Sequence, residues 1–279
     1  MIPQRNLSLL SNRLARGGGR RIPEAVLERD YCLSWFLVGL SRSPLRDRLL
    51  FKGGTALKKC YFADYRFSED VDFTLTQPVE FEPIRRELPA TFEAAHRASG
   101  VVLRYAREDR RPHANSYTFY LEYEGPLPGG GAGKEVKVDI TIREEVAFPI
   151  EERPVLRGYE EYEDLPEDAR VRVYSLAEIG TEKVVALLDR ARNEPRDLYD
   201  LWHLTENGHV VLGQVREALG RKLAARGVDL RSLQGVLREK EPRYRRLWET
   251  RLSAQVATLP DFDQVFRAVR RALRPTGVT

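Results

Sequence analysis

Three aspartates stand in patterns that suit the binding of a divalent cation. Asp70 and Asp72 lie two residues apart in the string SEDVDFTL, where strand alternation places both carboxylates on one face. Two neighbouring carboxylates repel each other unless a cation lies between them. Asp139 lies on the polar face of a second candidate strand, EVKVDITI, and joins the pair if the two strands are neighbours. Oxygen ligands of this kind predict a Mg²⁺ site that also binds nucleotide phosphates.

A glycine turn stands shortly before the first two aspartates. Gly53 and Gly54 separate an apolar strand from a helix that begins near Thr55. Glycine lets the backbone approach a ligand, and the N–H groups of a new helix favour phosphate. Thr55 would cap the helix or bind a phosphate oxygen. Two alternatives stay open, because such a turn also serves as a plain connection and paired aspartates also occur on exposed acidic strands.

Together, the three acids and the turn are typical of nucleotidyl transfer with two metal ions. In that chemistry Asp139 would serve as the general base or as a metal ligand on the acceptor side. A further group of charges follows in the second half of the chain. Lys183 and Arg190 are seven residues apart, which places them on one face of a helix, and Asp197 begins the next helix. They would bind phosphates and orient one another, or else form a solvated salt-bridged helix pair.

The elements that position these residues indicate an α+β fold. An N-terminal nucleotidyltransferase α/β domain with a mixed sheet is expected over residues 1–165, and a C-terminal helical domain over residues 166–279. In the first half, the periodicity predicts helices and strands, in chain order a helix at 22–40, a strand at 66–75, a helix at 83–99, and strands at 101–107, 116–124 and 134–142.

An irregular acidic linker is expected between the halves, at residues 149–169. After it, Ser175 and Glu178 form a capping-box pattern that opens a helix. The rest of the chain reads as helical up to about residue 274. Helix breaks are expected at Pro195, Gly208, Gly227, Pro242 and Pro260.

Composition narrows the class of protein without deciding its function. The chain has 279 residues and a formal net charge of +4, which fits an anionic partner such as an NTP or RNA. Cys32 and Cys60 are its two cysteines, so a disulfide framework is excluded. The first residues lack the apolar core of a signal peptide, and the longest apolar run, residues 32–40, is too short to cross a bilayer. We therefore expect a cytoplasmic protein without membrane contact.

Several strings of the sequence are similar to those of a known family. FKGGTAL at residues 51–57, followed by RFSEDVD at 66–72, resembles the AbiEii/AbiGii toxin family. These are nucleotidyltransferases of the DNA polymerase β-like superfamily, which includes the MenT toxins. ERDY at 28–31, Glu182-Lys183 and RDLYDL at 196–201 also resemble the pattern, so the likeness spans roughly residues 22–205.

This resemblance implies a toxin that uses Mg²⁺ and an NTP donor and has a cognate antitoxin encoded nearby. It implies an RNA acceptor, with the 3′ end of tRNA expected, and a block of translation. It places Lys183 and Asp197 in the active site with the three aspartates. The residues expected to bind the NTP are Lys52, Gly53, Gly54, Thr55, Ser68 and Arg190. Transfer to a protein side chain, or a non-catalytic protein that grips RNA or a partner, remain the alternatives.

Overall fold

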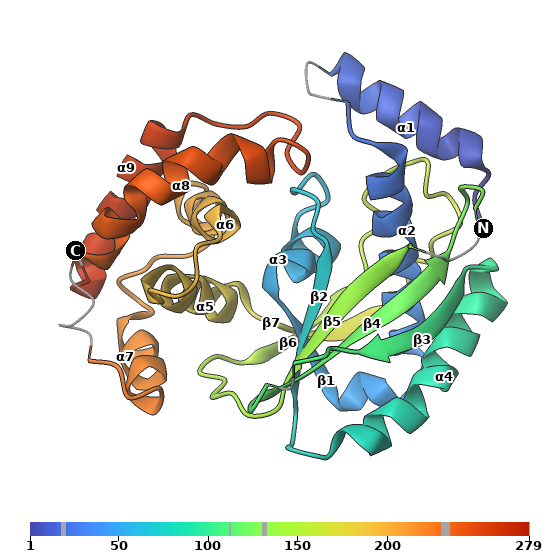
Figure 1. Cartoon of the computed structure of the whole chain (residues 1–279), viewed down its shortest axis with the longest axis horizontal. Helices are drawn as coiled ribbons and strands as arrows, with labels where there is room; N and C mark the ends of the chain where they lie inside the picture. Colours follow the sequence, from blue (N-terminus) through green and yellow to red (C-terminus); the bar gives the residue numbers. More distant parts are fainter. Residues whose placement is uncertain (18–20, 112, 130–132, 230–234, 279) are drawn as a thin grey trace. The chain divides into compact units, whose positions relative to one another are not determined.

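Two units make up the computed structural model, which describes residues 1–17, 21–111, 113–129, 133–229 and 235–278 (Figure 1). The first unit contains Met1–Glu144 and Ile150–Tyr174, and the second contains Glu145–Pro149 and Ser175–Thr279. The predicted boundary after residue 165 thus falls inside the first unit. The division lies later because the strand Arg170–Tyr174 belongs to the sheet of the first unit.

A seven-stranded mixed sheet forms the centre of the first unit, in the order β3-β4-β5-β2-β1-β7-β6. The strands are β1 (Leu49–Lys52), β2 (Asp70–Leu75), β3 (Val102–Glu108), β4 (Ser116–Glu124), β5 (Glu135–Thr141), β6 (Ile150–Pro154) and β7 (Arg170–Tyr174). β2 runs antiparallel to β1 and parallel to β5. The two strands that carry the three aspartates are therefore direct neighbours.

One face of these central strands is apolar and covered by helices. Val71 and Phe73 of β2 are buried, as are Val138 and Ile140 of β5, and polar residues alternate with them. The ring of Phe36, from α2 (Glu24–Ser41), lies 6.3 Å from that of Phe73, so α2 packs on this face. α2 also contacts α4 (Phe81–Ser99). The alternation leaves the aspartates on the opposite face.

The remaining elements of the first unit are short or lie before the sheet. They are α1 (Gln4–Arg16), η1 (Pro44–Asp47), α3 (Gly53–Ala56) and the π-helix η2 (Leu57–Tyr61). The linker predicted at 149–169 is wrong in part, because it contains β6, which pairs antiparallel with β7. β6 has the sequence IEERP, whose charges and proline suit an edge strand but carry little strand signal.

The second unit is helical, as predicted, and the α+β class with a mixed sheet is confirmed. Its helices are α5 (Leu176–Leu188), α6 (Pro195–Glu206), α7 (Arg216–Ala225), α8 (Val236–Leu252) and α9 (Phe262–Leu273), followed by η4 (Arg274–Thr276). The break expected at Pro242 is wrong, since α8 continues through it. Buried Tyr244 and Trp248 follow the proline, and their packing offsets a cost of about 3 kcal/mol for an internal proline.

The segment Glu145–Pro149 joins the second unit through buried charges. Ser175 caps α5 by accepting a hydrogen bond from the N–H of Glu178, as predicted. The carboxylate of Glu178 does not complete a capping box, because it accepts hydrogen bonds from the N–H groups of Ala147 (2.8 Å) and Phe148 (2.9 Å). Lys222 of α7 forms an ion pair with Glu178 at 2.6 Å. No helix among the described residues is long and apolar enough to span a membrane.

Candidate active site

The register between β2 and β5 brings the three aspartates to one face of the sheet. Asp72 is paired with Asp139, and Asp70 is paired with Lys137. Directly paired residues of neighbouring strands point to the same side, as do residues two apart in one strand. All four side chains therefore share the face opposite to the α2 side, and all four are half-buried.

Both carboxylate oxygens of Asp139 have neighbours from the sheet. Lys137 Nζ lies 2.6 Å from one, and the Thr118 hydroxyl donates to the other at 2.5 Å. Burial alone would lower the pKa of Lys137, but its hydrogen bond to Asp139 and the charges of Asp139 and Asp70 raise it. Lys137 is thus a cation beside at least two of the acids, and it offsets their mutual repulsion. Within the described ranges, no three His, Cys, Asp or Glu side chains are grouped as a metal site.

Gly53 places the glycine turn against the carboxylate of Asp72. Its φ is +77°, a conformation that favours glycine. A Cβ atom built on Gly53 would lie 2.5 Å from Asp72 Oδ2, closer than Cβ atoms come to neighbouring atoms in proteins. The turn that the sequence predicts to bind phosphate therefore lies in contact with one of the carboxylates that it predicts to bind metal.

Thr55 and Lys52, on either side of the glycines, bind protein groups in this structure. The Thr55 hydroxyl is buried and donates to the main-chain oxygen of Asp70, which ties α3 to the start of β2. The helix lacks a side-chain cap. Lys52 Nζ donates to the Thr141 hydroxyl at 3.0 Å and lies 5.6 Å from the centre of the Tyr174 ring. Of the two roles predicted for Thr55, capping is wrong, and its hydroxyl holds the strand instead.

Ser68 lies outside the strand on which it was expected. The prediction placed a strand at residues 66–75, but β2 begins at Asp70, where its pairing with β5 begins. Ser68 is half-buried in the segment before the strand. Strand alternation therefore does not place Ser68 beside the two aspartates.

Lys58, which the sequence analysis did not single out, holds the segment that leads into β2. Its Nζ donates to the carbonyls of Ala63 (3.3 Å) and Tyr65 (3.1 Å) and to the Tyr159 hydroxyl (3.0 Å), and it lies 4.3 Å from the centre of the Phe67 ring. The side chain is 3% exposed, and burial lowers its pKa to about 8. Two adjacent lysines inside an apolar helix were the signal that could have found it.

In the second unit, Lys183 forms a buried ion-pair cluster. Its Nζ lies 2.7 Å from Asp197 and 2.6 Å from Asp200, whereas Arg192 Nε binds Asp197 at 2.6 Å. Asp197 is 1% exposed and Asp200 is 0% exposed. Burial would raise the pKa of Asp197, but the charges of Lys183 and Arg192 lower it. The predicted pair is thus in contact, and Asp200 and Arg192 are partners that the sequence analysis missed.

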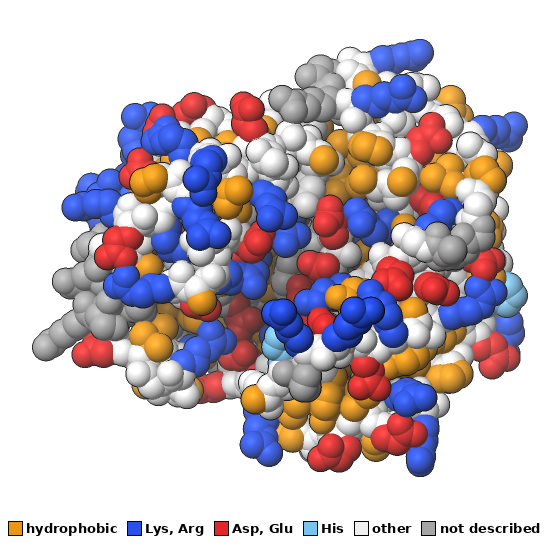
Figure 2. Space-filling model, in the orientation of Figure 1, with side chains coloured by type: hydrophobic (Ala, Val, Ile, Leu, Met, Phe, Trp, Pro, Cys, Tyr) orange, Lys and Arg blue, Asp and Glu red, His pale blue; other side chains and the backbone are white. Residues whose placement is uncertain are grey.

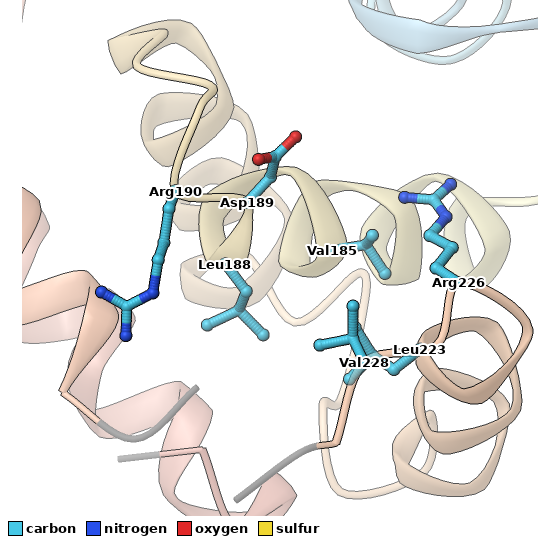
Figure 3. A pocket seen from close by; sticks show the side chains of 7 residues that line it. All are labelled: Val185, Leu188, Asp189, Arg190, Leu223, Arg226 and Val228. Carbon is cyan, nitrogen blue, oxygen red and sulfur yellow. The ribbon is translucent and has the colours of Figure 1, made fainter. Parts of the chain in front are cut away.

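Arg190 does not lie on the same helical face as Lys183. α5 ends at Leu188 with Asp189 as its C-cap, so Arg190 follows the helix, and the face prediction is wrong. Its guanidinium forms an ion pair with Glu239. Arg190 also lines a cavity of about 440 Å³ in the second unit, with Val185, Leu188, Asp189, Leu223, Arg226 and Val228 (Figure 3).

Comparison with known proteins places the chain in a family. It matches the family described as "Nucleotidyl transferase AbiEii toxin, Type IV TA system" over residues 35–268, whereas no curated protein sequence matches it. The fold is similar to that of MenT4, a nucleotidyltransferase toxin from Mycobacterium tuberculosis H37Rv. The TM-score is 0.69 and the identity 20%, over 97% of this chain and 89% of that chain. JHP933 from Helicobacter pylori has a TM-score of 0.53 and 15% identity, over 92% of this chain and 94% of that chain.

The matched region contains the glycine turn, the aspartates of β2 and β5, and the Lys183 cluster. It spans most of the chain, and the family is the one that the motifs resemble. The family resemblance inferred from the sequence motifs is therefore confirmed. The chain is a nucleotidyltransferase, and it belongs to the AbiEii toxin family of type IV toxin–antitoxin systems.

Proposed function

We propose that this toxin transfers a nucleoside monophosphate from an NTP to RNA, with the 3′ end of tRNA as the acceptor, and so blocks translation in the cytoplasm. The observation that carries the proposal is the contact between the glycine turn and Asp72, on the sheet face shared by Asp70 and Asp139. This juxtaposes a phosphate-binding backbone with oxygen ligands for a divalent ion. A cognate antitoxin is the expected protein partner.

The donor set fits Mg²⁺, which prefers carboxylate oxygens together with substrate phosphates. Asp70 and Asp72 would hold the ions, with Asp139 as the third carboxylate once Lys137 releases it. When bound, the two ions supply charge stabilisation for the reacting phosphate and the pyrophosphate leaving group. Asp139 would accept the proton of the attacking RNA hydroxyl or orient that hydroxyl.

The remaining predicted residues would bind the triphosphate. The N–H groups of Gly53 and Gly54 would donate to its oxygens, and Thr55 would contribute through its main chain, since its hydroxyl is engaged by Asp70. Lys52, Ser68 and Arg190 stay proposals as phosphate ligands. Lys183 and Asp197 stay proposals as active-site residues, with Asp197 orienting the Lys183 side chain.

Incubation of the protein with MgCl₂, each α-labelled NTP in turn and total RNA tests this function. We expect one NTP to label RNA of tRNA size, and EDTA to abolish the label. Oxidation of the RNA with periodate should also abolish it, because that reaction destroys the 3′ diol. A label found on protein would favour the alternative acceptor. Absence of label with every NTP and both kinds of acceptor would overturn the proposal and favour a non-catalytic binding protein.

A further inference from the structure

A stripe of arginines runs along α9 and continues into the first residue of η4. Arg267, Arg270, Arg271 and Arg274 follow one another at i, i+3, i+4 and i+7, the spacing that places residues on one side of a helix. The opposite side is apolar and buried, with Val265, Phe266, Val269 and Leu273 among its residues. A stripe of this length extends about 10 Å along the helix axis.

None of these four arginines forms an ion pair within the described part of the chain. The nearest acid of the helix, Asp263, is occupied by Arg245 of α8, whose guanidinium donates to both its oxygens at 2.6 and 2.9 Å. The charge of Arg267 contributes to the lowered pKa of Asp263, but no ion pair or hydrogen bond joins these two described residues. α8 adds Arg243, Arg246 and Arg251, which are also exposed and have no ion pair to a described residue.

Some exposed arginines of the first unit differ in this respect. Arg42 lies 3.3 Å from Asp168, Arg86 3.1 Å from Glu82, and Arg97 2.9 Å from Glu93. α8 and α9 together carry nine lysines and arginines against four acidic residues. Figure 2 shows lysine and arginine side chains over the part of the surface where Figure 1 draws these two helices.

The helix dipole does not account for this arrangement. It favours cations in the last turn, which covers Arg270 and Arg271. Arg267 lies in the middle of the helix, and the α8 arginines lie on another element. Guanidinium groups without acid partners suit the phosphates of a nucleic-acid backbone, which they bind in bidentate fashion.

We propose that the α9 stripe, defined as Arg267, Arg270, Arg271 and Arg274, binds the phosphate backbone of the RNA acceptor. The inference rests on the proposed function and adds to it a surface that recognises the acceptor. Contacts to phosphates carry no sequence information. The stripe therefore raises affinity for RNA in general, and it leaves the choice of acceptor to other parts of the protein.

A charge-matched pair of variants tests the inference. The stripe variant is Arg267→Gln/Arg271→Gln/Arg274→Gln, and the control is Arg42→Gln/Arg86→Gln/Arg97→Gln, which removes the same charge from ion-paired positions. Binding of fluorescent tRNA is measured at several salt concentrations. The stripe variant should bind at least about tenfold more weakly at physiological salt, and the slope of log K against log[salt] should fall by about 2 to 3. The control should bind as the wild type does.

Turnover separates this inference from the function on which it rests. In the stripe variant, KM for RNA should rise by about the same factor as Kd, while KM for the NTP and kcat at saturating RNA stay unchanged. Normal labelling with an unchanged KM for RNA would overturn the inference and leave the proposed function standing. A second outcome is that the stripe variant binds RNA more weakly than the control does, although the wild type labels no RNA. That result would support the stripe as an RNA-binding surface and overturn the proposed function. Unchanged RNA binding with loss of antitoxin binding would overturn the inference and assign the stripe to a protein partner.

Discussion

At the scale of single residues, two groups of contacts matter most. One joins Gly53 to the carboxylate of Asp72, and the other joins Lys183 to Asp197 and Asp200. Strand alternation was sufficient to predict that Asp70 and Asp72 share one face, whereas Asp139 shares it because β2 and β5 are neighbours in the sheet. The sequence pattern was not sufficient to predict that Lys137 and Thr118 donate hydrogen bonds to the Asp139 carboxylate, because such contacts depend on the register between strands. Arg190 was misplaced because periodicity cannot tell on which side of Leu188 the helix ends.

Replacement of Gly53 by alanine should abolish nucleotide transfer. The alanine would have to adopt a φ of +77°, and its Cβ atom would lie 2.5 Å from Asp72 Oδ2, so the carboxylate must move. We expect the transfer rate to fall by at least about a hundredfold, or about 3 kcal/mol. Gly100→Ala is the matched control, with a φ of +78° and its nearest neighbours at 3.9 Å. It should lose about 1 kcal/mol of unfolding free energy from strain and keep its activity. Equal activity in both variants would contradict the account.

Loss of Lys183 should destabilise the protein, because it leaves Asp197 and Asp200 buried beside fewer cations. Breaking a buried pair from one side costs about 3–5 kcal/mol. The lowered pKa of Asp197 stabilises the fold above the ordinary pKa of an aspartate, about 4, and this contribution is lost as the pH falls through the lowered value.

Denaturant titration of Lys183→Met and Lys183→Arg between pH 3 and pH 7 measures this effect. The methionine variant should be the less stable at pH 7, and the difference should shrink toward pH 3. The arginine variant should recover most of the stability. A methionine variant as stable as the wild type at pH 7 would show that the cluster has no such role.

At the scale of elements, the sequence predicted those with strong periodicity and missed those defined by their partners. α4, β4 and β5 follow their patterns closely. β6 was not predicted, because its charged residues and Pro154 have low strand propensity. The strand predicted at 66–75 begins late because residues before Asp70 are held by Lys58 rather than by a neighbouring strand. A buried lysine that binds carbonyls leaves no periodic trace in a sequence.

The hold of Lys58 on that segment should depend on pH. Its pKa is lowered to about 8 from an ordinary value of 10.5, so burial disfavours its charged form. Between these two values the unfolded chain binds more protons than the folded one, and stability therefore rises with pH. Relative to Lys58→Met, the wild type should gain about 3 kcal/mol of unfolding free energy between pH 8 and pH 10.5. A difference that stays constant over this range in denaturant titrations would contradict the assigned environment.

At the scale of the whole molecule, composition gave a net charge of +4 and little more, because a sum does not show where charges lie. The structure shows that some exposed arginines of the first unit are paired, whereas α8 and α9 carry several without an ion pair to a described residue. It also shows that the segment 145–149 leaves the first unit to bind Glu178 and Lys222 in the second. Such long-range pairing cannot be read from local patterns.

The central claim is that the carboxylates of β2 and β5 perform the transfer. The most direct test is the rate of transfer from labelled NTP to RNA. It is measured over a range of MgCl₂ concentrations for the wild type, for Asp72→Asn and for Glu69→Gln, a variant of the exposed neighbouring residue. The account predicts that Asp72→Asn loses about a thousandfold or more at every concentration, or about 4 kcal/mol of transition-state stabilisation, while Glu69→Gln stays near the wild type. A folded Asp72→Asn protein that transfers within tenfold of the wild-type rate would contradict it.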